Sequence, residues 1–273
     1  ALYMYFVAGD LTWQHIGTDV YVYWGVDPAD PYAGATLGGP DAFLYSPAFA
    51  QVFALFSVIP REVFLVLWVA LLAATALWLA RPWLAALLVL ALPLSQELMM
   101  GNIHLLLAAA IVLSFRWVGL WAFVILTKVT PGVALLWFVA RREWRKLLIV
   151  AAVTGAITAV SYAINPGAWH SWLDLLLREG GPQRQLLPLR IALAAVITVW
   201  GALTDRPWVL PAAAMLALPV IWSDSRSMLL GCVALTGAAY TVSRQESPLD
   251  PAEDGTRRLV PDILNRRWAT RSH

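Results

Sequence analysis

Long apolar runs separated by short polar breaks dominate the chain. The runs at residues 62–80 and 147–164 are apolar almost throughout, and a helix needs roughly 20 such residues to cross a hydrocarbon core of about 30 Å. Charged residues make up 13% of the chain, whereas an ordinary soluble domain carries about a quarter. Because so few charges cannot cover a water-exposed surface, the sequence predicts an all-α fold, a polytopic transmembrane helical bundle surrounded by membrane lipids.

The positions of Lys and Arg orient the predicted helices. Residues 1–60 contain neither but include five aspartates, so the positive-inside rule places this segment on the non-cytoplasmic side. The first helices are then expected to run inward over 62–80, outward over 83–99 and inward over 104–114. Later crossings are expected at 147–164, 191–203, 208–222 and 228–242.

Both ends of the chain carry their own signals. The start, "ALYMYFVAG", is expected to be the last turns of a spanning helix that begins before this sequence. The predicted membrane domain covers residues 1–245, with an outer catalytic loop at 10–46 and an outer interfacial loop at 165–188. In the second loop, apolar residues recur at helical spacing, as in a helix that lies in the membrane interface. Residues 246–273 are charged and Pro-rich, which predicts a disordered cytoplasmic tail.

The stretch "ILTKVTPGVALLWFVARREWRK", residues 125–146, interrupts an apolar run with a lysine and a proline. Arg116 and the basic cluster at 141–146 should both be cytoplasmic, but only about one helix length separates them. Two half-helices, 117–127 and 131–140, resolve this conflict if they meet at 128–130. Irregular backbone at membrane depth is tolerated where it lines a cavity or is buried in protein. The sequence therefore predicts a re-entrant or broken helix pair around Lys128.

Lys128 is the strongest single candidate for a site, since a lysine in the membrane costs about 2.5 to 3.5 kcal/mol on insertion scales. At the start of a half-helix the dipole is positive, so Lys128 and the backbone donors there favour an anion such as phosphate. A salt bridge to Glu97 is the structural alternative. Arg184 and Arg190 lie outside a predicted span, against the positive-inside trend, and are candidates for binding a lipid phosphate. Snorkelling or headgroup contact is the alternative.

A carboxylate and aromatic side chains lie together in "GTDVYVYWG". Asp19, flanked by aromatic rings in a partly desolvated pocket, suits a general base for a hydroxyl group, and Tyr23 and Trp24 suit a sugar pocket. An acid in a wet loop is the alternative. Tyr45 in "YSP" is a further pocket candidate, although Ser46 as an N-cap and a proline at the first helical position explain this motif by themselves.

The segment "SQELMMGNIH" places Glu97, Asn102 and His104 at or near membrane depth. Polar groups there are costly and by default indicate a site, so the three are assigned to the sugar or acceptor pocket. Capping by Asn102, ion pairing by Glu97 and a hydrogen-bonded structural role for His104 remain open.

Several classes of site find no support in the sequence. The four histidines show no metal-ligand spacing on one helix and no DxD pair occurs, so no metal and no cofactor are predicted. No Gly-rich phosphate loop follows a strand, and nothing indicates nucleic-acid binding. Cys232 lies alone in an apolar run, which leaves no disulfide framework.

The motifs "TDVYVY", "FLYSPAFA", "GNIHLLLAA" and "LTKVTPGVALLWFVARREWRK" occur in an order that resembles glycosyltransferase family 87. These are polyprenyl-phosphate-mannose-dependent mannosyltransferases of the C-type glycosyltransferase fold, typical of actinobacteria. The resemblance covers most of residues 15–240. Where members often carry a histidine-rich element before the last spans, this chain has "WSDSRSMLL".

The resemblance implies an inverting transfer of mannose from a polyprenyl-phosphate donor to a lipid-linked or glycan acceptor outside the cell membrane. It implies Asp19 as the catalytic base, Tyr45 in the tyrosine-proline element, and Lys128 with Thr130 and Pro131 in the lysine-threonine-proline element. A transporter or flippase of a lipid-linked sugar is the alternative, because broken helices and intramembrane charge fit it too. The large outer loop and the lack of inverted repeats favour the transferase.

Overall fold

Helices supply all the regular secondary structure in the part of the chain that the structure describes. The computed structural model describes residues 16–33, 35, 42–178 and 185–236, and the predicted tail at 246–273 lies outside these ranges. The elements are α2 (Thr18–Trp24), α3 (Pro47–Ala54), η2 (Leu55–Val58), α4 (Arg61–Ala80), α5 (Ala86–Val89), α6 (Ala91–Met100), α7 (His104–Leu113), η3 (Val118–Leu120), α8 (Trp121–Thr127), η4 (Thr130–Leu135), α9 (Leu136–Ala140), α10 (Trp144–Ile164), α11 (Pro166–Arg178), α13 (Leu187–Leu203), α14 (Val209–Leu216), η5 (Asp224–Leu229) and α15 (Leu230–Thr236).

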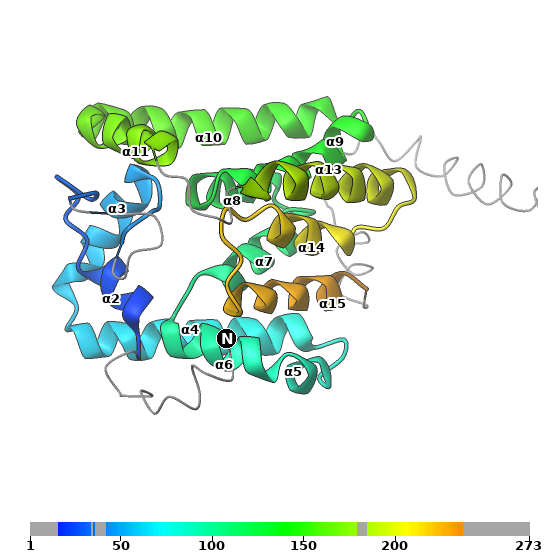
Figure 1. Cartoon of the computed structure of the whole chain (residues 1–273), viewed down its shortest axis with the longest axis horizontal. Helices are drawn as coiled ribbons and strands as arrows, with labels where there is room; N and C mark the ends of the chain where they lie inside the picture. The colour runs from blue at the N-terminus through cyan, green and yellow to red at the C-terminus, as the bar shows by residue number, and fades with distance from the viewer. Residues whose placement is uncertain (1–15, 34, 36–41, 179–184, 237–273) are drawn as a thin grey trace, which may run out of the picture. The chain divides into compact units, whose positions relative to one another are not determined.

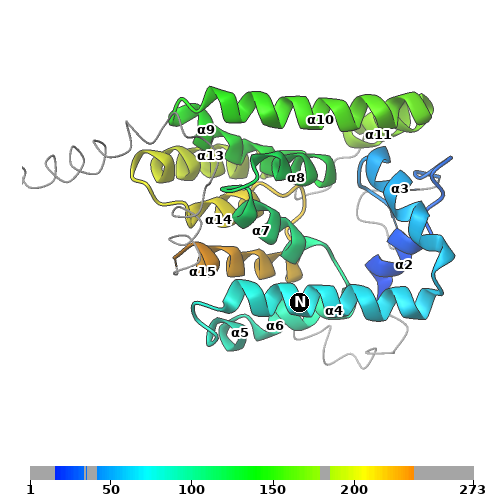
Figure 2. The same ribbon diagram turned by 180° about the vertical axis from the view of Figure 1, so that it is seen from behind.

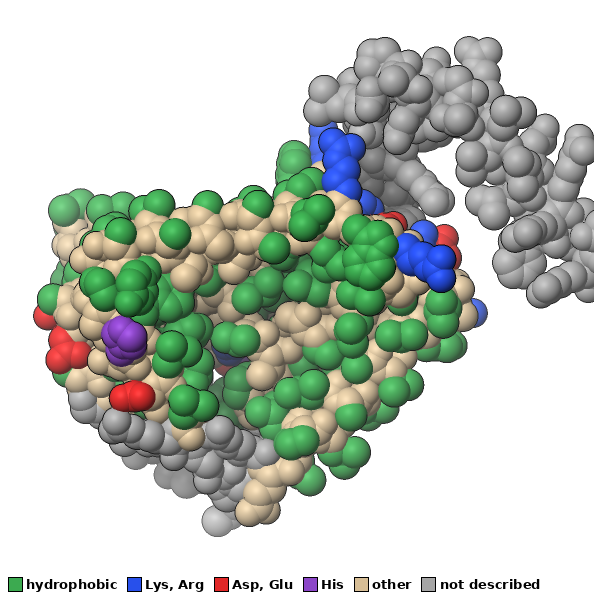
Figure 3. Space-filling view, turned by 90° about the horizontal axis from the view of Figure 1, so that it is seen from above, with side chains coloured by type: hydrophobic (Ala, Val, Ile, Leu, Met, Phe, Trp, Pro, Cys, Tyr) green, Lys and Arg blue, Asp and Glu red, His purple; other side chains and the backbone are tan. Residues whose placement is uncertain are grey.

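Two of these helices, α4 and α10, are long and apolar enough to cross a membrane. Helices α6 and α7 together pass the same test but are bent by 108° at their junction, which gives a third candidate span. The predicted helical bundle is confirmed. The space-filling view fits it, because hydrophobic side chains are spread over the face that Figure 3 draws and basic side chains gather toward one end of it, where α9 meets α10.

Helices α4 and α10 lie on opposite sides of the bundle, with α7, α8, α13, α14 and α15 between them (Figures 1 and 2). Helices α2, α3 and α11 gather at the end of the bundle where α4 begins and α10 finishes. One buried face of α4, with Phe64, Trp68, Leu72 and Leu79, packs on the core. The short helices α2 and α3 therefore cover the end of the bundle that holds the polar cluster described below.

The broken helix pair around Lys128 is confirmed as a hairpin. Helix α8 ends at Thr127, Lys128 has extended backbone angles, and the chain turns into η4 and α9. The two arms lie against each other, since the ring centroids of Trp121 in α8 and Phe138 in α9 are 6.4 Å apart. Both ends of the segment thus lie together and Lys128 occupies its apex.

Two predicted continuous spans are wrong. The segment at 83–99 is interrupted at Leu90 between α5 and α6, because Pro93 has no N–H and its ring would clash with the carbonyl four residues earlier in a continuous helix. The segment at 208–222 contains only α14, which ends at Leu216, and Pro219 stands in the stretch that follows it. Periodicity of apolar residues could not show either break.

The predicted helix in the loop at 165–188 is confirmed as α11, but part of its apolar stripe packs on protein. Trp169 and Trp172 are buried, and Trp172 Nε1 donates to the carbonyl of Leu44 at 3.2 Å. Leu173 and Leu177 are exposed, as expected for a helix whose other side meets lipid. Helix α11 therefore fastens the segment before α3 to the bundle.

The hairpin predicts the outcome of single-cysteine mapping. Cysteines placed at Trp117 and Ala140 in a Cys232→Ala background should react with a membrane-impermeant maleimide from the same side of the membrane. A cysteine at Val129, at the apex, should react slowly from that side. Labelling of 117 and 140 from opposite sides would contradict the hairpin.

The backbone conformation of Gly101 predicts how an alanine at this position changes stability. Gly101 ends α6 with a φ of +72°, and a Cβ there would collide with the side chain of Val20. Gly101→Ala should lower the free energy of unfolding by roughly 1–3 kcal/mol, read as a lower melting temperature in detergent. Gly155→Ala in α10 is the matched control, because nothing lies within 4 Å of its Cβ and alanine is the better helix former. Equal losses in both variants would refute this account of Gly101.

Candidate active site

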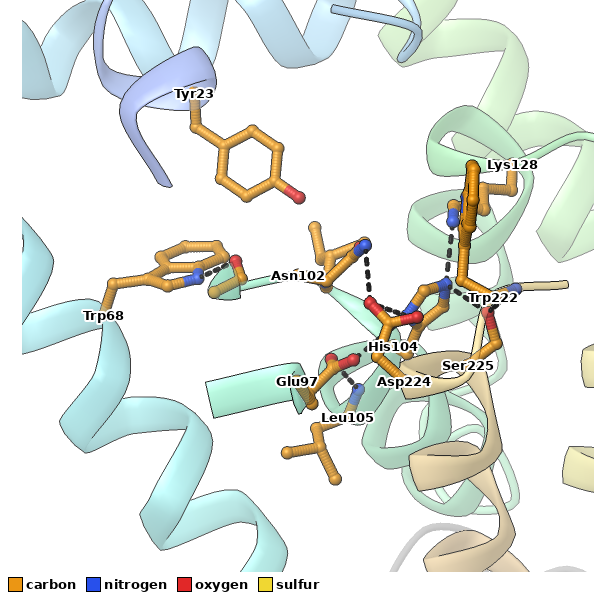
Figure 4. Close-up of polar contacts among 12 residues, drawn as sticks. Tyr23, Trp68, Glu97, Asn102, His104, Leu105, Lys128, Trp222, Asp224 and Ser225 are labelled. Atoms are coloured by element: carbon orange, nitrogen blue, oxygen red, sulfur yellow. Dashed lines mark hydrogen bonds and ion pairs between the residues drawn. The ribbon is translucent and has the colours of Figure 1, made fainter. Parts of the chain in front are cut away.

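A buried chain of polar side chains joins three parts of the bundle (Figure 4). Lys128 Nζ lies 2.9 Å from His104 Nε2, and His104 Nδ1 lies 3.0 Å from Glu97 Oε2. A protonated lysine can only donate, so His104 Nε2 accepts its hydrogen bond. The imidazole proton is then on Nδ1, which donates a hydrogen bond to Glu97. Both His104 and Glu97 are fully buried. The side chain of His104 therefore stands between the lysine and the carboxylate, and the direct Lys128–Glu97 salt bridge considered from the sequence is not formed.

The bend between α6 and α7 places Glu97 and His104 face to face. Gly101 ends α6 in the left-handed conformation, which lets the chain turn within three residues. Glu97 Oε1 then accepts a hydrogen bond from the backbone N–H of Leu105 at 3.1 Å, which satisfies one of the free N–H groups in the first turn of α7. Asn102 Oδ1 accepts from the N–H of Ile103 at 2.8 Å. Both side chains cap α7, and Asn102 thereby has the capping role considered from the sequence.

Asp224, in η5, is a member of the cluster that the sequence analysis missed. Its Oδ2 accepts a hydrogen bond from Asn102 Nδ2 at 3.1 Å and lies 3.8 Å from His104 Nδ1. Its Oδ1 is buried and has no hydrogen-bond partner among the described residues. Ser225 Oγ lies 3.3 Å from His104 Nε2. The polar run at 223–227 between two apolar segments was the only sequence signal for these residues.

Tyrosine side chains connect the cluster to α2 and to the segment before α3. Tyr23 Oη and Tyr45 Oη are 2.8 Å apart, and Tyr45 Oη lies 3.5 Å from Asn102 Oδ1. Tyr32 Oη donates to the carbonyl of Tyr45 at 2.6 Å, and burial raises the pKa of the Tyr32 phenol, which keeps that donor protonated. The backbone N–H of Ser46 also donates to the carbonyl of Leu126, just before the hairpin apex, at 3.3 Å. Tyr23 and Tyr45 thus form an aromatic wall beside Asn102.

Asp19 stands in the first turn of α2 and is half-buried. Tyr23 of the same helix bonds to Tyr45, whose Oη lies 3.5 Å from Asn102 Oδ1, so α2 adjoins the polar cluster. The candidate site therefore comprises Tyr23, Tyr45, Glu97, Asn102, His104 and Lys128, and Asp19 stands on the helix that contributes Tyr23.

Two predicted site residues make contacts outside the polar cluster, and a third is not among the described residues. Trp24 Nε1 donates to the carbonyl of Ile59 at 2.8 Å, away from the polar cluster. Arg190 Nη2 donates to the carbonyl of Pro219 at 2.9 Å, so it holds the stretch that leads to Asp224. Arg184 lies outside the described residues.

Comparison with known proteins gives one finding. The family model of glycosyltransferase family 87 matches residues 43–244. That range contains Tyr45, Glu97, Lys128 and Asp224, whereas Asp19 precedes it. No curated protein and no solved structure matches the chain.

The contacts from Lys128 through His104 to Glu97 predict how substitutions change the free energy of unfolding. Lys128→Met removes the cation and leaves two buried carboxylates without it, which should cost about 3–5 kcal/mol. Adding Glu97→Gln should restore part of that loss, because one of the two buried negative charges is then gone. Melting temperatures of the two single variants and the double variant measure the coupling.

The matched control is Lys146→Met, whose ion pair with Glu143 has a half-exposed lysine and should cost about 0–1 kcal/mol. Losses that simply add in the double variant would contradict an interaction between Lys128 and Glu97 through His104.

Proposed function

The chain belongs to glycosyltransferase family 87 and is a membrane glycosyltransferase, and we propose that it moves mannose from polyprenyl phosphate to a lipid-linked or glycan acceptor. One arrangement carries this proposal: α2, which holds the half-buried carboxylate of Asp19, is joined through Tyr23, Tyr45 and Asn102 to the cluster that holds Lys128. A base for the acceptor and a cation for the leaving group are the two charges that such a transfer requires.

Lys128 supports the departure of the lipid phosphate. When the bond between C1 of the sugar and the phosphate oxygen breaks, negative charge grows on that oxygen. The leaving group is an ionised phosphate, so it needs no proton from a general acid. It needs a fixed positive charge in a site with little water, where such an interaction is strong. Lys128 at the hairpin apex provides that charge, and Arg190, close to the stretch before η5, is a second candidate.

Asp19 acts on the acceptor. Its carboxylate takes the proton from the acceptor hydroxyl while the hydroxyl oxygen forms the new bond to C1. The attack comes from the face opposite the departing phosphate, so the configuration at C1 inverts. Tyr23, Tyr45 and Asn102 join α2 to the cluster of Lys128, and their hydroxyl and amide groups suit the hydroxyls of a sugar.

The proposed site faces the exterior of the cell membrane. The segment that carries Asp19, Tyr32 and Tyr45 has no basic residue before Arg61, whereas Arg141 and Lys146 lie at the base of the hairpin. By the positive-inside rule, the base of the hairpin lies in the cytoplasm and α2 lies outside. A lipid-linked donor then reaches the site from the bilayer without a nucleotide.

Asp19→Asn should abolish most of the transfer while donor binding persists. Loss of a general base lowers rates by about 10²–10⁴-fold, whereas the amide keeps the size of the side chain. The measurement is transfer of radiolabelled mannose from polyprenyl-phosphate-mannose to a lipid extract, with membranes that carry wild type or variant.

Asp30→Asn is the matched control, because Asp30 is an exposed acid of the same segment and the substitution should leave the rate unchanged. A wild-type rate in Asp19→Asn would remove Asp19 from the mechanism. Labelled donor that crosses the bilayer without transfer in any variant would instead support a transporter.

A further inference from the structure

We propose that Glu97, His104 and Asp224 hold a divalent cation next to Lys128. One ligand atom of each residue lies within 4.8 Å of the others, and His104 Nδ1 is 3.0 Å from Glu97 Oε2 and 3.8 Å from Asp224 Oδ2. Atoms that bind one ion at about 2.0–2.2 Å lie roughly 3–4 Å from each other. The three groups come from α6, α7 and η5, which explains why no ligand spacing is visible along the sequence.

The charges of the cluster support a cation. Glu97 and Asp224 are both at least nine-tenths buried, and Lys128 is the cation beside them. Buried charges in proteins are paired or coordinate metals. With both carboxylates ionised, one net negative charge remains, and Asp19 nearby adds another. With a bound divalent cation, the cluster of Glu97, Asp224, Lys128 and the ion carries a net positive charge.

Asp224 offers the cation a free ligand atom. Asn102 holds one carboxylate oxygen by a hydrogen bond, while Oδ1 is buried without a partner among the described residues. A buried acceptor without a partner is costly. A bound cation would satisfy it and would fix the carboxylate opposite His104, as Figure 4 shows the two side chains facing each other.

Cation binding would also change which groups His104 contacts. An imidazole that binds a metal through Nδ1 carries its proton on Nε2. Nε2 could then donate to Ser225 Oγ, 3.3 Å away, and could no longer accept from Lys128. The next step rests on the proposed function. The bound cation frees Lys128 to bind the donor phosphate and places a second positive charge beside that phosphate.

The test is binding of Mn²⁺, because one imidazole and two carboxylates suit that ion and its electron paramagnetic resonance signal reports the bound fraction. Purified protein in detergent, without donor, should bind one Mn²⁺ per chain. Glu97→Gln and Asp224→Asn should each weaken that binding at least tenfold. Glu62→Gln is the matched control, since that side chain is 74% exposed and its removal should leave the affinity unchanged.

Three outcomes decide between the accounts. Absence of Mn²⁺ binding in wild type, or equal affinity in folded Asp224→Asn, overturns the cation site. If transfer continues at the full rate in EDTA with no Mn²⁺ bound, the cation site fails and the transferase stands. If Mn²⁺ binds as expected but no donor is turned over, the cation site stands and the proposed function fails. Melting temperatures establish that each variant is folded.

Discussion

A lysine in an apolar bundle must find a partner, and the arrangement of this protein follows from how Lys128 finds one. Its ammonium meets His104, and His104 meets Glu97, at 2.9 and 3.0 Å. These contacts join the apex of the hairpin formed by α8, η4 and α9 to the bend between α6 and α7. Asn102, at the same bend, connects this chain of contacts to Asp224 in η5 and to Tyr45 before α3. The polar cluster thus fixes four separate segments around one point.

The same cluster explains why the candidate site lies at one end of the bundle. The hairpin turns back at Lys128, and the segment before α3 reaches its apex where the N–H of Ser46 bonds to the carbonyl of Leu126, while Tyr45 of that segment meets Tyr23 of α2. Asp19 stands in the first turn of α2. A carboxylate, an ammonium and two phenols in one protected region are suited to a reaction in which a hydroxyl attacks a sugar and a phosphate departs.

Features of the fold and the candidate site could be predicted from the sequence where a polar or charged residue is energetically costly at its expected depth in the membrane. Lys128 between two apolar half-helices indicated the hairpin, and the polar residues at 97–104 indicated a site. The breaks at Leu90 and after Leu216 were missed because apolar periodicity is unaffected by a proline that interrupts hydrogen bonding. Asp224 was missed because it is brought to His104 by tertiary packing across 120 residues, and single-sequence patterns carry no information about such contacts. Trp24 shared the sequence pattern of Tyr23, but its indole turns toward Ile59 instead.

The account depends most on Lys128 as the group that receives the lipid phosphate. Its most direct test is the equilibrium affinity of purified protein for polyprenyl phosphate, the product that leaves the reaction. Glu97→Gln is compared with the Lys128→Met/Glu97→Gln double variant, so that the two proteins differ only at the lysine and neither retains the negative charge of Glu97. The account predicts at least a tenfold weaker affinity in the double variant, a difference of about 1.4 kcal/mol or more. An affinity equal to that of Glu97→Gln in a folded double variant would contradict it.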